Sequence, residues 1–295
     1  MDHLPPARAR AAFLRACELD VAVRKPGNVS DASPGHGMHA ALFRASAQAA
    51  AGALCERGAR VGARIESAVA ATQAAAGCNT NLGILLLCAP IARAAELQPA
   101  ARTVRALRAA VETVLADLDL DDARAAYRAI ALARPGGLGA AAEQDVHVAP
   151  SVGLRAAMAL AAERDLVARQ YRDAYADLFD GGLAALSAGS RARAGKPGDP
   201  AAVQHLYLHL LATHPDSHIV RKQGLAVAQT VMNAAQAWLA RSSGGLRARA
   251  VLDDDAEFVQ WDAMLKASRI NPGTTADLTV ATLMLAGLID QNLAA

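Results

Sequence analysis

The stretch that decides the fold is GCNTNLGILLLCAP, residues 77–90. Small and polar residues without charge pass here directly into an apolar run. Asn79 or Thr80 can cap a helix, because a short side-chain oxygen accepts a hydrogen bond from an unpaired N–H group of the first turn. A helix that is apolar on nearly every side has to be buried. The stretch therefore predicts a buried helix over about 80–97 that starts inside the molecule.

A helix start of this kind is also a candidate binding site. Its free N–H groups and its dipole favour an anion, and a phosphate is the natural one. The alternative is a capped core helix that binds no ligand.

The composition predicts an all-α protein. The chain has 295 residues, of which 53% are hydrophobic and only 3% aromatic. Alanine is abundant, and it is the best helix former. We expect a single compact multi-helix domain of roughly ten to twelve helices over residues 1–295. Residues 189–200 are the most linker-like segment, and we expect a surface loop there, because helices of the same composition resume beyond it.

Charge and cysteine content restrict the partners and the compartment. A net charge of +2 argues against a nucleic-acid-binding surface, which is normally more basic. Four cysteines without a CxxC pair predict reduced thiols in a cytoplasmic protein. The longest apolar run is shorter than the roughly 20 residues that span a bilayer, so no membrane association is expected. Alanine-rich helix faces make a homodimer possible.

A long polar loop follows the first predicted helix. It begins with Lys25-Pro-Gly-Asn28 and continues through His36 to Met38. Long loops in a helical chain often carry function, so Lys25, Asn28 and His36 are candidate ligand groups. A solvated connector is the alternative.

A second group of polar residues lies near His214. A helix is expected over about 217–240, and its first turns place His218, Arg221 and Lys222 on one side. Cations at a helix start oppose the helix dipole. A bound polyphosphate would compensate for them, and so would an ion pair with Asp216.

Two further histidines, His205 and His209, have an i,i+4 spacing that can hold zinc. No HExxH pattern accompanies them, so ordinary surface or core histidines are the favoured interpretation.

The last motif is NPGTTADL, residues 271–278, which opens a final apolar helix. Thr274 or Thr275 can cap this helix. Asp277 has the sign that the helix dipole prefers, so it can be purely structural. The same carboxylate can also serve as a magnesium ligand or a general base.

Together the motifs resemble a known family. They are KPGNV (25–29), GHGM (35–38), NTNLG (79–83), DSH (216–218) with Arg221-Lys222, and NPGTTADL (271–278). Five motifs in this order resemble the triphosphoribosyl-dephospho-CoA synthases, also called ATP:dephospho-CoA triphosphoribosyltransferases, over nearly the whole chain. The resemblance implies an all-helical enzyme that joins C1′ of the ATP ribose to the 2′-hydroxyl of 3′-dephospho-CoA and releases adenine. The product is a prosthetic-group precursor for the acyl carrier proteins of citrate lyase and malonate decarboxylase.

The chain also departs from the family pattern. Relatives of the citrate lyase type are closer to KPGLVD and carry Asp between the His and Met of the second motif, where this chain has Asn28 and Gly37. The KPGNV form resembles a branch associated with one-carbon (methanopterin-type) cofactor gene sets. Another acceptor is therefore an alternative to dephospho-CoA.

The resemblance implies roles for particular residues. Cleavage of an N-glycosidic bond builds oxocarbenium-like charge, which carboxylates stabilise, and a triphosphate requires Mg²⁺ and cations. We expect Asp277 or Asp216 to act as base or magnesium ligand, and His36 and His218 to transfer a proton to adenine. The substrate-binding set is Lys25, Asn28, Asn79, Thr80, Asn81, Arg221, Lys222, Thr274 and Thr275.

These residues are expected to meet where the loops at 25–38, 77–83, 213–222 and 271–278 converge. Two other functions stay open from the sequence. One is a nucleotide N-glycosidase, with water as acceptor. The other is a helical protein that binds a nucleotide without turnover.

Overall fold

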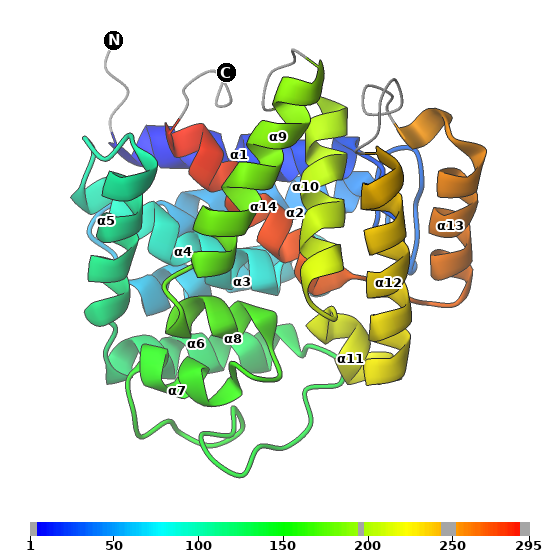
Figure 1. The fold of residues 1–295 in the computed structure, drawn as a ribbon. Helices are drawn as coiled ribbons and strands as arrows, with labels where there is room; N and C mark the ends of the chain where they lie inside the picture. Colours follow the sequence, from blue (N-terminus) through cyan, green and yellow to red (C-terminus); the bar gives the residue numbers. More distant parts are fainter. Residues whose placement is uncertain (1–4, 194–197, 243–251, 290–295) are drawn as a thin grey trace.

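The computed structural model describes residues 5–193, 198–242 and 252–289 (Figure 1). Within these ranges the chain forms 14 α-helices and no β-strand, so the predicted all-α class is confirmed and the helix number exceeds the predicted range. The helices are α1 (Pro5–Ala22), α2 (Ala40–Leu54), α3 (Val61–Ala76), α4 (Leu82–Leu97), α5 (Val104–Ala116), α6 (Leu120–Ala133), α7 (Leu154–Ala161), α8 (Leu166–Arg172), α9 (Leu183–Arg193), α10 (Pro200–Thr213), α11 (Ser217–Gln223), α12 (Leu225–Ser242), α13 (Ala256–Ala267) and α14 (Gly273–Ile289).

Two short elements complete the chain. A π-helical turn, η1 (Asp177–Gly182), leads into α9, and a 3₁₀ turn, η3 (Leu252–Asp254), precedes α13. No helix among the described residues combines the length and apolarity that crossing a bilayer requires.

The extra helices arise where predicted long helices are interrupted. The pattern over 152–180 predicts one long helix or two in tandem, and the structure has successive helices there, with α8 starting after Asp165, whose carboxylate accepts from the N–H groups of Val167 and Ala168. The expected helix over 217–240 is divided at Gly224, whose φ of +91° suits glycine. The expected surface loop at 189–200 is helical up to Arg193, and residues 194–197 lie outside the described ranges.

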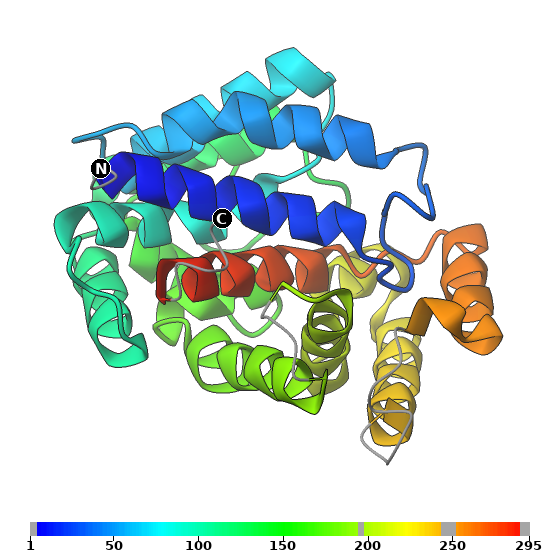
Figure 2. The ribbon, with the colours of Figure 1, turned by 90° about the horizontal axis from the view of Figure 1, so that it is seen from above.

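Helix α4 lies at the centre of the larger hydrophobic cluster. Residues 84–92 of this helix are all buried, as the apolar run predicts. Helices α1, α3, α5 and α14 pack around it, and Figure 2 shows α1 beside α14. A second cluster joins α10, α11, α12 and α13 around Tyr207, Trp238 and Phe258. The first turn of α4 belongs to the larger cluster and that of α11 to the second cluster, while α14 contributes residues to both.

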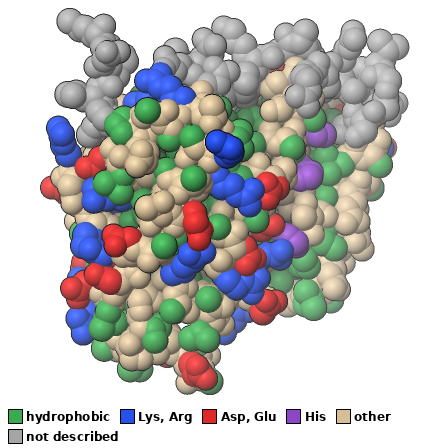
Figure 3. Space-filling view, turned by 60° about the vertical axis from the view of Figure 1, so that its left-hand side comes forward, with side chains coloured by type: hydrophobic (Ala, Val, Ile, Leu, Met, Phe, Trp, Pro, Cys, Tyr) green, Lys and Arg blue, Asp and Glu red, His purple; other side chains and the backbone are tan. Residues whose placement is uncertain are grey.

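Charged side chains of both signs are mixed on the surface that Figure 3 shows. Ion pairs between exposed side chains include Arg108 with Asp180 (2.6 Å) and Arg128 with Glu66 (2.6 Å). Such exposed pairs each contribute little to stability.

A single buried carboxylate joins the starts of α11 and α14. One oxygen of Asp216 accepts from the Ile219 N–H at 3.0 Å. The other accepts from the Thr275 N–H at 2.7 Å and from the Thr275 hydroxyl at 2.8 Å. Asp216 is fully buried, so it satisfies donors of two helices that water does not reach. Thr274 and Thr275 lie inside the first turn of α14 and do not precede it, which corrects their expected role as caps.

Proline 90 lies inside α4 and removes one donor from the helix. Without an N–H at position 90, the Leu86 carbonyl has no intrahelical donor. The buried hydroxyl of Tyr171 donates to this carbonyl at 2.6 Å, and Tyr175 donates to the neighbouring Leu87 carbonyl at 2.8 Å. Tyr171 therefore replaces the missing backbone donor, and the two hydroxyls together hold the α8 region against α4.

We predict that the cost of Tyr171→Phe depends on Pro90. The substitution should lower the free energy of unfolding by about 1–3 kcal/mol, because it leaves the buried Leu86 carbonyl without a partner. In a Pro90→Ala background an N–H at position 90 can supply that partner, so the same substitution should cost less. Urea unfolding of the four proteins in this cycle measures the difference. Equal costs in both backgrounds would contradict this interpretation.

We also predict that Asp216→Ala is strongly destabilising. It removes the acceptor of three buried donors, and each stranded donor costs about 1–3 kcal/mol. Asp255 provides a matched control, since it caps α13 through Glu257 and Phe258 but is partly exposed. Asp255→Ala should cost about 1 kcal/mol. Thermal unfolding of both variants tests the comparison, and similar losses would show that Asp216 is an ordinary cap.

Candidate active site

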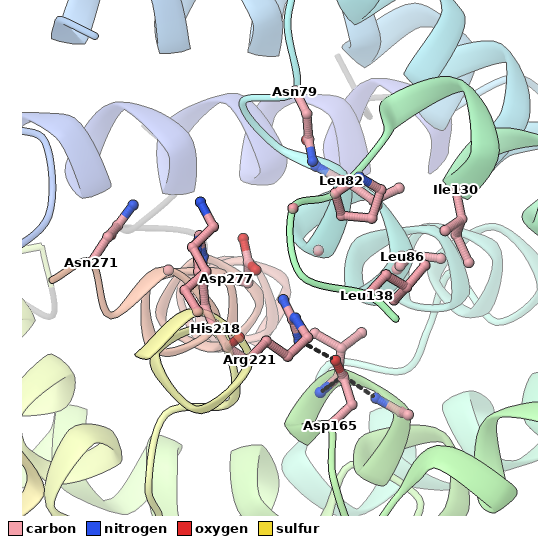
Figure 4. A pocket seen from close by; sticks show the side chains of 18 of the residues that line it. Asn79, Leu82, Leu86, Ile130, Leu138, Asp165, His218, Arg221, Asn271 and Asp277 are labelled. Carbon is pink, nitrogen blue, oxygen red and sulfur yellow. Dashed lines mark hydrogen bonds and ion pairs between the residues drawn. The ribbon is translucent and has the colours of Figure 1, made fainter. Parts of the chain in front are cut away.

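A cavity of about 1220 Å³ opens where the predicted loops converge. Its wall includes the loop before α2, the start of α4, the loop between α6 and α7, helix α11 and the start of α14 (Figure 4). The predicted site residues that line it are Asn28, His36, Asn79, Thr80, Asn81, His218, Arg221, Lys222, Thr274 and Asp277. Lys25, Asp216 and Thr275 lie behind this wall.

Lys25 is in a different place from the one expected for a phosphate ligand. Its ammonium group is fully buried, 2.7 Å from the Asp20 carboxylate and 2.7 Å from the Asn28 side-chain oxygen. The Asn28 amide in turn donates to the Asn271 side-chain oxygen at 3.0 Å. Lys25 therefore orients Asp20 and Asn28, which do line the cavity, and links the KPGN and NPG motifs.

Asp216 and Thr275 are likewise used by the fold. All three donors at the Asp216 carboxylate belong to the starts of α11 and α14. The Thr274 hydroxyl accepts from the Ser217 hydroxyl at 3.0 Å. We therefore leave Asp216 out of the candidate catalytic and metal-binding groups.

The start of α4 presents unpaired donors to the cavity. The N-cap position is taken by Asn81 and not by Asn79 or Thr80 as predicted, although the Asn79 side-chain oxygen does accept from the Leu82 N–H at 3.1 Å. The Thr80 hydroxyl instead donates to Ser46 at 2.7 Å. Asn81 is 5% exposed, and its side-chain amide nitrogen has no partner among the described residues. The N–H groups of residues 83 and 84 also lack a described acceptor, so this helix start can receive an anion.

Asp277 faces the start of α4 from the first turns of α14 (Figure 4). A Cβ atom on Gly83 would lie 2.0 Å from the nearer Asp277 oxygen, so only glycine fits opposite this carboxylate. No hydrogen bond or ion pair to Asp277 occurs within the described ranges. Burial, and then the charges of Asp216 and Asp20, raise the pKa of Asp277 well above its usual range. Asp277 is therefore a carboxylate without a protein partner, and it can accept a proton from a substrate hydroxyl.

His218 lies beside Asp277 and is neutral at pH 7. Burial and the nearby cations Lys222 and Arg221 lower the pKa of His218 to about 4. Its Nε2 atom has no described partner, and its ring rests on Gly273, where a Cβ would lie 2.3 Å from Nδ1. In this state His218 cannot give a proton as an imidazolium, which differs from its expected role. The His36 Nε2 atom is occupied by a 2.8 Å hydrogen bond to the Gly27 carbonyl.

Cations surround the polar part of the wall. Arg221 pairs with Asp165 at 2.6 Å, and not with Asp216, the partner that the sequence suggested. Four more cations on the wall, Arg134, Arg164, Lys222 and Arg269, form no ion pair within the described part of the chain. Unpaired cations that surround a cavity attract a polyanion.

The predicted set of site residues contains none from the loop of residues 134–153. This loop supplies several wall residues, among them Leu138 and Asp145. The Asp145 carboxylate holds the loop in shape by accepting from the Ala141 and His147 N–H groups, and Tyr127 donates to the Gln144 carbonyl at 2.7 Å. Its length without regular structure was the one available signal.

Metal-binding groups are sparse. The described residues contain no cluster of three His, Cys, Asp or Glu side chains that could hold an ion. His205 and His209 lie on α10, away from the cavity wall. In the polar part of the wall, Asp277 and Asp20 are the carboxylates that could reach an ion carried by a substrate.

Comparisons with known proteins give a family and a similar fold. The sequence model of CitG, the ATP:dephospho-CoA triphosphoribosyl transferase, matches residues 6–294. A solved structure from Archaeoglobus fulgidus, provisionally named a triphosphoribosyl-dephospho-CoA synthase, has the same fold, with a TM-score of 0.64 and 24% identity. The superposition covers 83% of this chain and 98% of that one. Comparison with curated proteins gives no match. By the match over nearly its whole length, the chain belongs to the ATP:dephospho-CoA triphosphoribosyl transferase family.

Proposed function

We propose that the cavity transfers the triphosphoribosyl group of ATP to the 2′-hydroxyl of 3′-dephospho-CoA, with Asp277 as the catalytic carboxylate. The bond between C1′ of the ATP ribose and N9 of adenine breaks, and a bond between C1′ and the acceptor O2′ forms. The hydroxyl proton passes to Asp277 and from there to solvent, and N9 of the leaving adenine takes up one proton from water, so that the proton lost by the acceptor balances the one gained by adenine. The observation that carries this assignment is a carboxylate without a protein partner, set against a helix start with free donors.

Asp277 suits both demands of this reaction. Its negative charge stabilises the oxocarbenium-like transition state at C1′. Its raised pKa makes it a stronger base than an exposed aspartate, because the best general base has a pKa near the working pH.

The polyphosphate groups find their partners around Asp277. Arg221 and Lys222 lie on α11 at one side, and the free N–H groups and Asn81 lie at the start of α4. Arg134 and Arg164 add unpaired charge from the neighbouring wall. Such donors bind and orient phosphates.

The wall also fits magnesium as an ion that arrives on ATP. Mg²⁺ commonly takes one or two carboxylates together with substrate phosphates and water. Of the two wall carboxylates, Asp20 would hold it, in place of the Asp216 or Asp277 ligand expected from the sequence, so that Asp277 stays free as the base. When bound, the ion neutralises part of the triphosphate charge.

Adenine release distinguishes this function from its alternatives. We expect the protein to form adenine from ATP and MgCl₂ when dephospho-CoA is present, and none without it, as quantified by liquid chromatography. Adenine formed without an acceptor would indicate a nucleotide N-glycosidase. Adenine formed only with a methanopterin-type acceptor would indicate the one-carbon branch, and binding of ATP without adenine would indicate a non-catalytic protein.

Substitution of Asp277 should separate activity from stability. Asp277→Asn should lower kcat by about 100-fold or more, because it removes the base. The same change should raise the melting temperature at pH 7. A carboxylate whose folded-state pKa is raised opposes folding when ionised, and a neutral amide removes that penalty. The exposed Asp180 offers a control, and Asp180→Asn should keep both values.

The pH profile gives an independent check on the same residue. Since the ionised carboxylate is the base, activity falls as the pH drops through the pKa of Asp277. The acid limb of kcat/KM should therefore lie above the ordinary aspartate value of about 4. A limb at the ordinary value, or an active Asp277→Asn variant with an unchanged profile, would exclude Asp277 as the base.

A further inference from the structure

The cavity has two chemically different ends. Figure 4 shows Asn271, His218, Arg221 and Asp277 grouped at one end. At the other end lie Leu82, Leu86, Ile130 and Leu138, and the lining there continues with Leu154, Ala157 and Met158. The second group, which we call the aliphatic wall, offers almost no side-chain hydrogen-bonding groups.

The aliphatic wall contains apolar surface that the fold does not use. Leu138 is 36% exposed although it lines a cavity. It lies next to Gly137, whose φ is +77° and where a Cβ would lie 3.0 Å from the Arg221 carbonyl. This close approach fixes Leu138 beside the residue that pairs with Asp165, so the two ends of the cavity adjoin.

The cavity is large enough for more than one ligand. Its volume of about 1220 Å³ exceeds the roughly 300–1,000 Å³ of a typical small-molecule pocket. ATP and dephospho-CoA share an adenosine and a chain of phosphates. They differ in the pantetheine arm of dephospho-CoA, an uncharged chain with a gem-dimethyl group, two amides and a thiol.

We infer that the aliphatic wall holds the pantetheine arm and that Leu138, Ile130 and Leu86 determine the choice of acceptor. This inference rests on the proposed function. The aliphatic side chains themselves offer the edge of an adenine ring no hydrogen-bonding partner. The Asn271 side-chain amide lies at the other end of the cavity, and the Asn79 oxygen beside Leu82 already accepts from the Leu82 N–H. A flexible, largely apolar chain gains by covering the wall, because burial removes apolar surface from water.

Leu138→Ser tests the inference with little risk to folding, because this side chain is partly exposed. We expect the KM for dephospho-CoA to rise about tenfold, while kcat and the KM for ATP stay unchanged. Leu138→Met keeps the apolar volume, so its KM for dephospho-CoA should equal that of the wild type. Leu132 on α6 is 42% exposed and does not line the cavity, so Leu132→Ser is the matched control and should change neither KM.

Two other kinetic results for Leu138→Ser would overturn the inference. A higher KM for ATP with an unchanged KM for dephospho-CoA would assign the wall to the adenine of the donor. No change in either KM would show that the wall contacts neither substrate.

Failure of the proposed function is separated from these results by direct binding. If the wild-type protein releases no adenine, calorimetric titration with dephospho-CoA and with ADP, which lacks the arm, still tests the wall. The inference expects tighter binding of dephospho-CoA than of ADP, and loss of that difference in Leu138→Ser. Equal affinities in the wild type would overturn it.

Discussion

The site depends on one buried carboxylate that serves two helices. Asp216 accepts from the backbone at the starts of both α11 and α14, and this shared acceptor fixes the distance between the two helix ends. Because His218 and Arg221 follow on α11 and Asp277 on α14, the same contact brings these side chains to one wall. Replacing a satisfied buried acceptor leaves its donors stranded, so the arrangement tolerates little change at position 216. Both Asp216 oxygens already accept hydrogen bonds from the protein, so the catalytic carboxylate has to be a different residue.

Local sequence patterns predicted much of the architecture. The apolar run after Asn79 predicted a buried helix with a polar start, and α4 has both. The abundance of alanine predicted the all-α class. Four separate motifs were expected to meet, and residues from each of them line the cavity. These inferences succeeded because side-chain periodicity and helix-cap chemistry are local properties.

The sequence did not predict how deeply charged side chains are buried or which distant residues they pair with. Lys25 and Asp216 looked like site residues because they are charged and occur in motifs, yet both are buried and paired. Sequence does not distinguish a charge that meets a ligand from one that meets the protein. The partner of Arg221 is Asp165, 56 positions away. Leu138 became a wall residue only through the contact of Gly137 with α11, which no local pattern encodes.

The groups that the fold leaves unsatisfied mark the site more clearly than the motifs do. Asp277, Asn81 and His218 have free polar atoms at the cavity, whereas Lys25, Asp216 and Thr275 behind the wall are paired. Burial shifts the pKa of Asp277 upward and that of His218 downward, so each shift favours the neutral form. The cations Arg221 and Lys222 contribute to the low pKa of His218. A triphosphate bound beside them would offset their charge, and it would thereby weaken this part of the shift.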